Sequence, residues 1–376
     1  MGLLSFWEIE TYYADNDIVI IGGGLMGIWT AIELKERNPS LKITIVERHI
    51  SPLGASTRNA GFACFGSLTE LLSDEAKMGT DAMLHIAGMR YKGIQKIKQF
   101  VTEQSIDFDP CGGYEPLVNY GSSDVLNDKI QYLNQLLLPL TGVDQTFSNA
   151  TNRIAAIGLK NFDQLVYNPL EAGIHSGKLV NGLTSIALHK GVRLLNGINI
   201  EGWTENNHSV ELITNQPFQL KANKVVICTN GFTESLVPEL KIEPARGQII
   251  LTKPISNLIT KGTFHFDEGF YYWRNVGNRI LLGGARNSDF DNERTTNFDG
   301  SNRIENILTE FINTHVILNE PVEIEQSWSG IMGFTTDKLP LCKSISTNIV
   351  AAIACNGMGV ALTPIIAEKV ATTLAI

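Results

Sequence analysis

The chain has 376 residues, of which 43% are hydrophobic and 18% are charged, and this balance excludes intrinsic disorder, collagen and coiled coil. Its 30 Lys and Arg residues and 39 Asp and Glu residues give a formal net charge of −9. No cluster of basic residues is present to neutralise phosphates, which argues against a nucleic-acid partner. The 34 glycines exceed the roughly 7% that is usual in proteins, so their positions along the chain are informative.

The N-terminal stretch and the cysteines predict a cytoplasmic protein without a membrane span. The apolar run within residues 1–7 is too short for a signal peptide and is followed by acidic residues. No window reaches 18 apolar residues without a charge. The five cysteines are scattered, odd in number and free of C-x-x-C spacing, which is typical of a reducing compartment and not of a disulfide framework or a zinc site.

A glycine-rich turn follows the first predicted strand. The β-branched run Ile18–Ile21 is typical of a buried parallel strand, and Gly22, Gly24 and Gly27 after it fit the spacing G-x-G-x-x-G. Residues 28–37 then have apolar side chains at helical spacing. In such a turn the glycines allow a tight bend, a close approach of the backbone to a pyrophosphate, and close packing of helix on strand. The phosphates lie at the positive end of the helix.

An acidic residue stands where a dinucleotide needs one. A second predicted strand, residues 42–46, ends in Glu47, which lies 20 residues after Gly27. At this distance an acidic side chain binds the ribose hydroxyls of a dinucleotide. The alternative is a plain βαβ unit with a solvated glutamate. The next segment, residues 54–62, is small and polar, which suits a large, planar, polar cofactor in extended form.

These segments resemble the D-amino-acid-oxidase-like superfamily of FAD-dependent oxidoreductases, the group of glycine oxidase, sarcosine oxidase and D-amino-acid dehydrogenase. Residues 5–8, the glycine motif and residues 54–61 are most similar to its gamma-glutamylputrescine oxidoreductase branch. Further similar blocks run nearly to the end of the chain, at residues 169–200, 224–231, 243–248, 271–284, 328–337 and 354–360.

The resemblance implies an α/β plus antiparallel β fold, in which an FAD-binding Rossmann-like domain of the glutathione-reductase type is interleaved with an antiparallel-sheet substrate domain. We expect the FAD-binding domain to comprise residues 1–80, 165–235 and 330–376, and the substrate-binding domain to comprise residues 81–164 and 236–329. Residues 122–150 are expected to form a helix and a loop, to which we assign no function.

The resemblance also implies the FAD contacts. Residues 56–61 are expected along the pyrophosphate and toward the flavin, and Ile200 at the adenine. A helix beginning near Gly359 would direct its positive end at the flavin edge that becomes negative on reduction. The expected cofactor contacts are Gly22, Gly24, Leu25, Met26, Gly27, Glu47, Arg48, Ser56, Thr57, Arg58, Asn59, Ala60, Gly61, Ile200, Thr229, Asn230, Gly231, Gly330, Asn356, Gly357, Met358, Gly359 and Val360.

Three departures from the family bear on the chemistry. Met332 stands where glycine and D-amino-acid oxidases carry an arginine that clamps the substrate carboxylate, and a thioether cannot do this. Leu281 stands where sarcosine oxidases carry a lysine that promotes reaction with oxygen, which weakens the case for a fast oxidase. The cysteine that tethers FAD in those enzymes aligns near Gly330, so we expect FAD to be bound non-covalently here.

The candidate substrate pocket is made mainly of arginine and aromatic residues. Its expected members are Arg58, Arg246, Gln248, Tyr272, Arg274 and Met332. The arginines could hold an anionic group or neutralise the cofactor phosphates. The aromatic run 271–273 could wall an amine pocket through cation–π contact or pack the sheet. The seven histidines share no ligand spacing, so no metal site is predicted and each is assigned a structural or surface role.

The predicted reaction is oxidation of a C–N bond in an amine or amino acid. Enzymes of this family transfer a hydride from the carbon beside nitrogen to flavin N5, and the imine product hydrolyses. The electron acceptor is O₂, a quinone or another carrier. The alternatives are an FAD-dependent 2-hydroxy-acid dehydrogenase and a flavin-binding protein without turnover.

Overall fold

The computed structural model describes residues 4–376. The first three residues, which bear on the expected absence of a signal peptide, lie outside the described residues. Contacts divide the chain into two compact units, each made of separate stretches of sequence. Unit 1 comprises Met1–Thr57, Gly177–Pro244 and Met332–Ile376, and unit 2 comprises Arg58–Ser176 and Ala245–Ile331.

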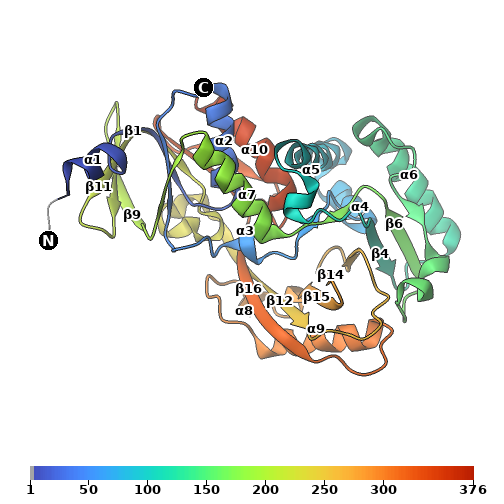
Figure 1. Ribbon diagram of the computed structural model, residues 1–376. Coiled ribbons are helices and arrows are strands. Elements are labelled where there is room, and N and C mark those ends of the chain that lie inside the picture. The colour runs from blue at the N-terminus through green and yellow to red at the C-terminus, as the bar shows by residue number, and fades with distance from the viewer. Residues whose placement is uncertain (1–3) are drawn as a thin grey trace. The chain divides into compact units, whose positions relative to one another are not determined.

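A mostly parallel sheet forms the centre of unit 1 (Figure 1). Strand β1 (Asn16–Ile21) lies parallel between β2 (Ile43–Glu47) and β11 (Gln219–Ile227), and the full order is β17-β18-β11-β1-β2-β8, with β10 and β9 added antiparallel at β11. The other strands are β8 (Arg193–Asn196), β9 (Ile200–Glu205), β10 (Val210–Thr214), β17 (Leu341–Ser344) and β18 (Ile349–Ile353). Every residue of β2 and β18 is buried, as expected for strands covered on both faces.

Three long helices accompany this sheet, and two of them pack on each other. They are α2 (Leu25–Arg37), α7 (Ser176–His189) and α10 (Gly359–Thr373), and a short helix, α1 (Phe6–Thr11), precedes β1. Helix α2 lies against α10, where Arg37 donates hydrogen bonds to the Thr372 hydroxyl at 3.1 Å and to the Glu368 carbonyl at 3.0 Å. These hydrogen bonds join the C-terminal end of α2 to the last turns of α10.

Unit 2 contains a mostly antiparallel sheet of order β16-β12-β15-β14-β13-β4-β6-β5, in which only the β13–β4 pair is parallel among the register pairs described. Its strands are β4 (Gly113–Leu117), β5 (Ser148–Asn149), β6 (Gln164–Asn168), β12 (Glu243–Thr252), β13 (Thr263–Phe266), β14 (Tyr271–Val276), β15 (Arg279–Gly284) and β16 (Ile324–Phe334). A separate two-stranded ladder pairs β3 (Phe62–Ala63) with β7 (Ala172–Gly173).

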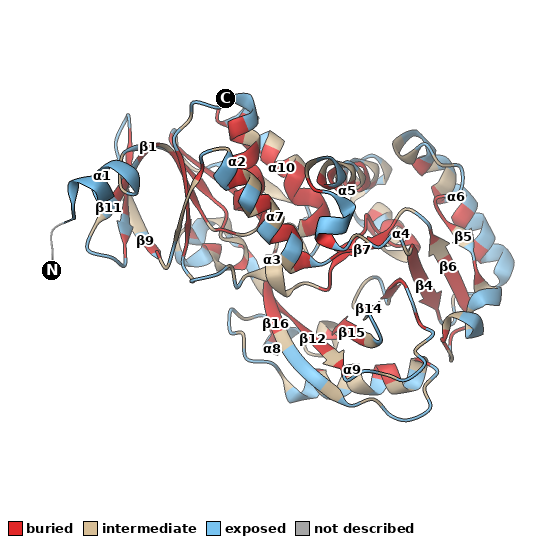
Figure 2. Ribbon diagram, viewed as in Figure 1, coloured by how far each residue is buried: buried red, intermediate tan, exposed pale blue. Residues whose placement is uncertain are grey.

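The core of unit 2 is aromatic. Trp273 is 1% exposed and stacks on Phe264 with ring centroids 4.9 Å apart. Helix α9 (Asn302–His315) adds Phe311 from its apolar face, and Figure 2 shows the alternation of buried and exposed residues along this helix. The remaining helices are α4 (Leu68–Met78), α5 (Thr80–Phe100), α6 (Ser123–Thr141) and α8 (Phe290–Glu293), and α3 (Ala55–Arg58) carries the chain across the boundary between the units. The short 3₁₀ helices are η1 (Glu103–Ile106), η2 (Thr151–Arg153), η3 (Ala155–Ile157), η4 (Asn230–Ser235), η5 (Pro238–Leu240) and η6 (Arg286–Ser288).

The predicted fold class is confirmed, and the two units interleave along the chain. Residues 58–80 and 165–176, which the sequence grouped with the FAD-binding segments, pack in unit 2 because β3 pairs with β7 and because Glu115 of β4 binds the start of α4. The helix and loop expected over 122–150 are α6 and the turn before β5. Within residues 4–376, no helix combines the length and the apolar character needed to cross a membrane.

Candidate cofactor and substrate sites

The glycine-rich turn lies between β1 and α2 in unit 1. Gly22 has φ +115°, a conformation that favours glycine, and its N–H donates to the Val46 carbonyl at 2.8 Å. A Cβ on Gly22 would lie 2.6 Å from the carbonyl oxygen of Cys228, and a Cβ on Gly27 would overlap the carbonyl oxygen of Gly22. The backbone in this turn is therefore as closely packed as the motif requires, and only glycine fits at both positions.

Glu47 and Ser56 bind the backbone of the same turn. The buried carboxylate of Glu47 accepts hydrogen bonds from the N–H of Gly23 at 2.9 Å and from that of His49 at 3.1 Å. The hydroxyl of Ser56 accepts from the N–H of Leu25 at 2.9 Å, in the first turn of α2. Gly24 is the N-cap of α2 and has no side chain that could block the helix end. A glycine cradle, a helix N-terminus and an acidic residue at the end of β2 fit a dinucleotide such as FAD.

Three further segments with expected cofactor residues lie in unit 1. Ile200 is 5% exposed at the start of β9, and Thr229 precedes Asn230 and Gly231 in η4. Asn230 has φ +48°. The Arg48 guanidinium lies 3.8 Å from the ring centroid of Phe232. The structure thus places β1, β2, β9 and η4 in one unit.

The segment before α10 is shaped by the Asn356 side chain. Its carboxamide oxygen accepts from the N–H of Thr335 at 2.9 Å, and Asn356 and Gly357 both have positive φ angles. Met358 is the N-cap of α10, which begins at Gly359. Thr57 and Val360 also lie in unit 1, where the Thr57 hydroxyl donates to the Pro52 carbonyl at 2.6 Å and Val360 is buried.

Met332 lies near this segment. Its sulfur would be 3.8 Å from a Cβ on Gly357, and its side chain is partly exposed. Met332, which we expect in place of the carboxylate-binding arginine, thus lies in unit 1.

The expected contacts Arg58, Asn59, Ala60, Gly61 and Gly330 lie in unit 2. Arg58 donates to the Ser329 carbonyl at 2.8 Å and lies 4.8 Å from the Phe298 ring centroid. Asn59 accepts from the N–H of Gly61 at 2.8 Å and from the Ser176 hydroxyl at 2.6 Å. These contacts fix the conformation of the segment.

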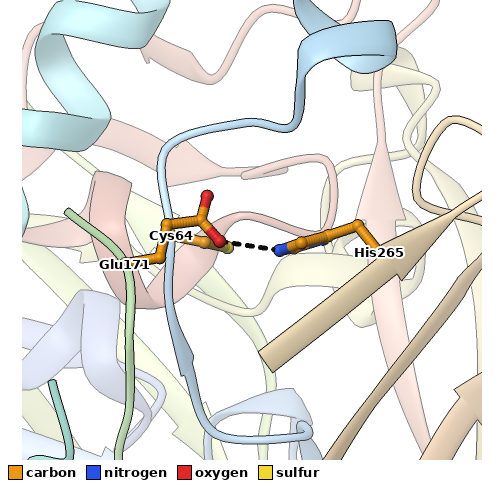
Figure 3. A group of neighbouring side chains, drawn as sticks. All are labelled: Cys64, Glu171 and His265. Carbon is orange, nitrogen blue, oxygen red and sulfur yellow. Dashed lines mark hydrogen bonds and ion pairs between the residues drawn. The ribbon is translucent and has the colours of Figure 1, made fainter. Parts of the chain in front are cut away.

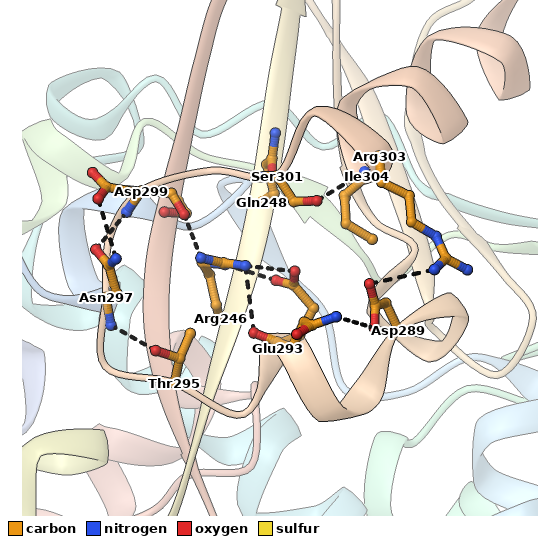
Figure 4. A network of polar contacts seen from close by, with 12 residues as sticks. Arg246, Gln248, Asp289, Glu293, Thr295, Asn297, Asp299, Ser301, Arg303 and Ile304 are labelled. Atoms are coloured by element: carbon orange, nitrogen blue, oxygen red, sulfur yellow. Dashed lines mark hydrogen bonds and ion pairs between the residues drawn. The ribbon is translucent and has the colours of Figure 1, made fainter.

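Arg246 forms a buried ion pair. Its guanidinium binds both carboxylate oxygens of Glu293, at 2.8 and 2.7 Å, and also donates to the Asp299 carbonyl (Figure 4). The hydrogen bonds that Arg246 donates to Glu293 raise the pKa of Arg246, and Glu293 is 2% exposed. On the same strand, Gln248 is 1% exposed and accepts from the N–H of Ser301 at 2.7 Å. Both expected substrate residues therefore tie β12 to the chain between α8 and α9.

The aromatic run on β14 divides between the two faces of the sheet. Tyr271 stacks on Phe311 at 4.7 Å and Trp273 is in the core, so these two members pack the sheet. Tyr272 points to the opposite face, where burial raises its pKa to about 12. Arg274, on that same face, donates to the carbonyls of Gly61 at 2.6 Å and Ile174 at 3.0 Å.

Sequence reasoning missed a buried cluster next to Tyr272. The Nε2 atom of His265 lies 2.9 Å from an Oε2 of Glu171, and the Cys64 thiol lies with them, all three being less than 7% exposed (Figure 3). Burial and the Glu171 charge raise the pKa of Cys64 well above its usual range. Each of the three residues is more than 90 positions from the next one in the sequence, so no local spacing reveals them. The one available signal was an acidic residue beside the small-residue pair Ala172–Gly173.

Comparisons with known proteins agree with this geometry. The family described as FAD dependent oxidoreductase, DAO, matches residues 17–373. A probable oxidoreductase OrdL of Haemophilus influenzae is 24% identical over 95% of this chain and 82% of its own length, and the L-2-hydroxyglutarate dehydrogenase of Escherichia coli K12 is 22% identical over 78% and 71%.

Solved structures share the fold. The L-proline dehydrogenase of P. horikoshii superposes with a TM-score of 0.76 at 18% identity, and the glycine oxidase of Geobacillus kaustophilus with 0.73 at 19%. Each comparison covers 96% of this chain and 94% of the other. The match of the family model over nearly the whole chain confirms the predicted family, enzyme class and cofactor. The chain belongs to the DAO family of FAD-dependent oxidoreductases.

Proposed function

We propose that this enzyme oxidises a C–N bond of an amine or amino acid. When bound, FAD supplies a two-electron acceptor that takes a hydride from the carbon beside nitrogen. The substrate's C–N single bond becomes a C=N bond with loss of a proton, and water then converts the imine to a carbonyl compound and a free amine. The chain's own residues hold the cofactor and orient the substrate.

Unit 1 would hold the cofactor without a covalent bond. Gly22, Gly24 and Gly27 let the backbone approach the pyrophosphate, and the N-terminus of α2 favours its negative charge. The Glu47 carboxylate is placed at the end of β2 to accept from ribose hydroxyls. The turn before α10, from Asn356 to Val360, would face the flavin edge, and the remaining expected contacts follow the resemblance.

The observation that favours an amine over a substrate with a carboxylate is the state of Arg58, Arg246 and Arg274, three of the arginines in unit 2. Arg58 and Arg274 bind backbone carbonyls, and Arg246 binds Glu293. A 2-hydroxy acid or an amino acid carries a carboxylate that is best bound by an arginine with two free donors. Because these guanidinium groups serve the fold, the amine is favoured over the 2-hydroxy acid, and Arg246 has a structural role.

Three similar proteins bear on this choice. Glycine oxidase and L-proline dehydrogenase are named for substrates that contain a C–N bond, whereas L-2-hydroxyglutarate dehydrogenase is named for a hydroxy acid. The hydroxy-acid dehydrogenase is therefore kept as the second candidate.

We place the enzyme in the cytoplasm because all five cysteines are free thiols, which suits a reducing compartment.

Anaerobic mixing of the purified holoenzyme with candidate substrates tests the proposal. Alkylamines, N-methyl amines, amino acids and 2-hydroxy acids are compared as separate sets, and absorbance of the oxidised flavin at about 450 nm is followed. Bleaching by one of the nitrogen-containing sets supports the proposal, and bleaching by hydroxy acids alone replaces it with the second candidate. A flavin that stays oxidised with every set contradicts both. Addition of O₂ or a quinone to the reduced enzyme then identifies the electron acceptor.

A further inference from the structure

The cluster around Glu171 holds a polar atom that has no partner. The Oε1 atom of Glu171 is buried and makes no hydrogen bond, and the residue is only 1% exposed. The Cys64 sulfur lies within 4.8 Å of a carboxylate oxygen of Glu171. Buried polar groups are nearly always satisfied, so the unsatisfied carboxylate oxygen indicates a missing ligand.

The charges nearby leave Glu171 without a full counter-ion. Arg90 lies 3.0 Å from Glu70 and 3.9 Å from Asp74, so its charge is already shared by two carboxylates. Glu115 is satisfied by hydroxyl groups of the α4 N-terminus. The only positive partner of Glu171 in the described structure is His265, which is charged only when protonated. The charge of Arg286 acts on Tyr272, where it opposes the effect of burial on the pKa. The acceptor that is open to one more cation is therefore the Glu171 carboxylate.

Aromatic rings line the same place. Phe62 meets the His265 ring edge-to-face at a centroid distance of 5.2 Å and the Tyr272 ring at 6.3 Å. His265 and Tyr272 are directly opposite each other on β13 and β14, so their side chains share one face of the sheet. Phe62 begins β3, which pairs with β7, and Glu171 directly precedes β7. Three separate parts of the chain thus build one wall, and Figure 3 shows Glu171, Cys64 and His265 converging on it.

We propose that Glu171, Tyr272 and Phe62 form the site that binds the positively charged amine of the substrate. An ammonium group has only donors, which match the free Oε1 acceptor of Glu171 and the phenol oxygen of Tyr272, and it is attracted to an aromatic face. His265 is the positioning residue that holds the other oxygen of Glu171. This inference rests on the proposed function and names its substrate class as a cationic amine without a neighbouring carboxylate.

A pair of ligands that cannot be oxidised tests this binding separately from turnover. tert-Butylammonium carries the charge but has no hydrogen on the carbon beside nitrogen, and pivalate has the same shape with a carboxylate. Calorimetric titration of the holoenzyme is expected to show tighter binding of tert-butylammonium than of pivalate. Glu171→Gln should weaken the ammonium at least about ten-fold, and Tyr272→Phe about two- to ten-fold, because the first removes a charge-assisted contact and the second a neutral one.

Glu115→Gln is the matched control. It replaces another buried carboxylate of the same unit whose oxygens are already satisfied, so ammonium affinity should not change. Flavin content and near-ultraviolet circular dichroism check that each variant is folded. Equal ammonium affinity in the Glu171→Gln and Glu115→Gln variants, or preference for pivalate, overturns the inference even if the wild-type flavin is bleached by amines.

A metal ion is the competing occupant of this cluster, because thiol, imidazole and carboxylate are zinc ligands. Metal analysis of the dialysed enzyme and titration with Co²⁺ separate the two. We expect no stoichiometric metal and no thiolate-to-cobalt absorption band. A bound metal that is lost in a Cys64→Ser variant overturns the amine site. If wild-type flavin is bleached only by hydroxy acids, the proposed function itself has failed.

Discussion

Unit 1 presents mainly backbone to its expected ligand, whereas unit 2 presents side chains and buries their charges. In the turn after β1, three glycines bring peptide groups close together, and one carboxylate, Glu47, is held by N–H groups. In unit 2 the buried pairs Arg246–Glu293 and Glu171–His265 each join segments that are far apart in the sequence. The cofactor of a family is constant and its substrates vary, so a fixed backbone cradle and an adjustable side-chain wall suit these two tasks.

The first way to test this contrast is to break the largest buried ion pair. Glu293→Gln leaves the Arg246 charge buried without a counter-ion, which is expected to cost about 3–5 kcal/mol of unfolding free energy. Urea unfolding followed by tryptophan fluorescence measures this loss. The double variant Arg246→Met with Glu293→Leu removes both charges and should recover much of the stability.

The exposed pair Lys253–Glu323 on the same sheet provides the control. Glu323→Gln should leave the unfolding curve unchanged, because such pairs contribute little. If Glu293→Gln were as stable as Glu323→Gln while amine or amino-acid binding was lost, Arg246 would have to be a substrate residue rather than a structural one.

The second test adds a single methyl group to the cradle of unit 1. In Gly27→Ala the new Cβ would overlap the Gly22 carbonyl, so the turn must shift. We expect a loss of about 1–3 kcal/mol in stability, as for other overpacked sites, and flavin content below about one-tenth of wild type. The ratio of flavin to protein absorbance measures the second effect.

Gly202→Ala is the matched control, because a Cβ there meets only one side-chain atom at 4.0 Å. It should retain wild-type flavin. Helix propensity favours alanine over glycine within α2, so a loss of stability or of flavin in the Gly27→Ala variant could not be caused by a lower helix propensity. Full flavin content in Gly27→Ala would show that close packing of β1 and α2 is not required.

The two units also differ in how much of their structure could be predicted from the sequence. The cradle is contiguous: strand, glycines, helix and Glu47 follow within 32 residues, from Asn16 to Glu47. Each has a known backbone requirement, so the sequence predicted the fold there, and the FAD contacts at this turn stay a prediction. Glu171 and His265 meet only because β7 and β13 are brought together by the fold. Likewise, Arg246 has the same residue type whether it binds a substrate or Glu293, and the sequence alone does not contain its partner. Because successive side chains of a strand point to opposite faces of the sheet, the sequence could have predicted that Tyr272 and Trp273 of β14 lie on different faces.

The third test concerns Glu47, a charged side chain of unit 1 that we expect to bind FAD. Glu47→Gln keeps the shape but removes the carboxylate that would accept from ribose hydroxyls, and a charge-assisted hydrogen bond contributes about 1.5–3 kcal/mol. FAD should therefore bind about 10- to 100-fold more weakly, as measured by fluorescence titration of the deflavinated protein. Glu201→Gln, at an exposed position of β9, is the control and should bind FAD as wild type does. Unchanged affinity in Glu47→Gln would place the adenine ribose elsewhere.

The smallest expected effect is a pH dependence confined to unit 2. Burial lowers the pKa of His265, but the charge and hydrogen bond of Glu171, together with Glu70 and Glu115, outweigh it and raise the pKa above its usual value. A pKa raised in the folded state means that the His265–Glu171 pair stabilises fully below the unfolded pKa and loses this contribution as pH rises through the folded pKa. Burial also raises the pKa of Glu115, which acts in the same direction.

Urea unfolding between about pH 6 and about pH 9 should therefore show wild-type stability falling toward alkaline pH. His265→Gln should reduce this slope, and adding Glu115→Gln should reduce it further. The slope that remains toward pH 9 is expected from the buried thiols, whose pKa values burial raises. A slope that is the same in wild type and in His265→Gln would mean that His265 is neutral when folded, and Glu171 would then need its cation from the substrate alone.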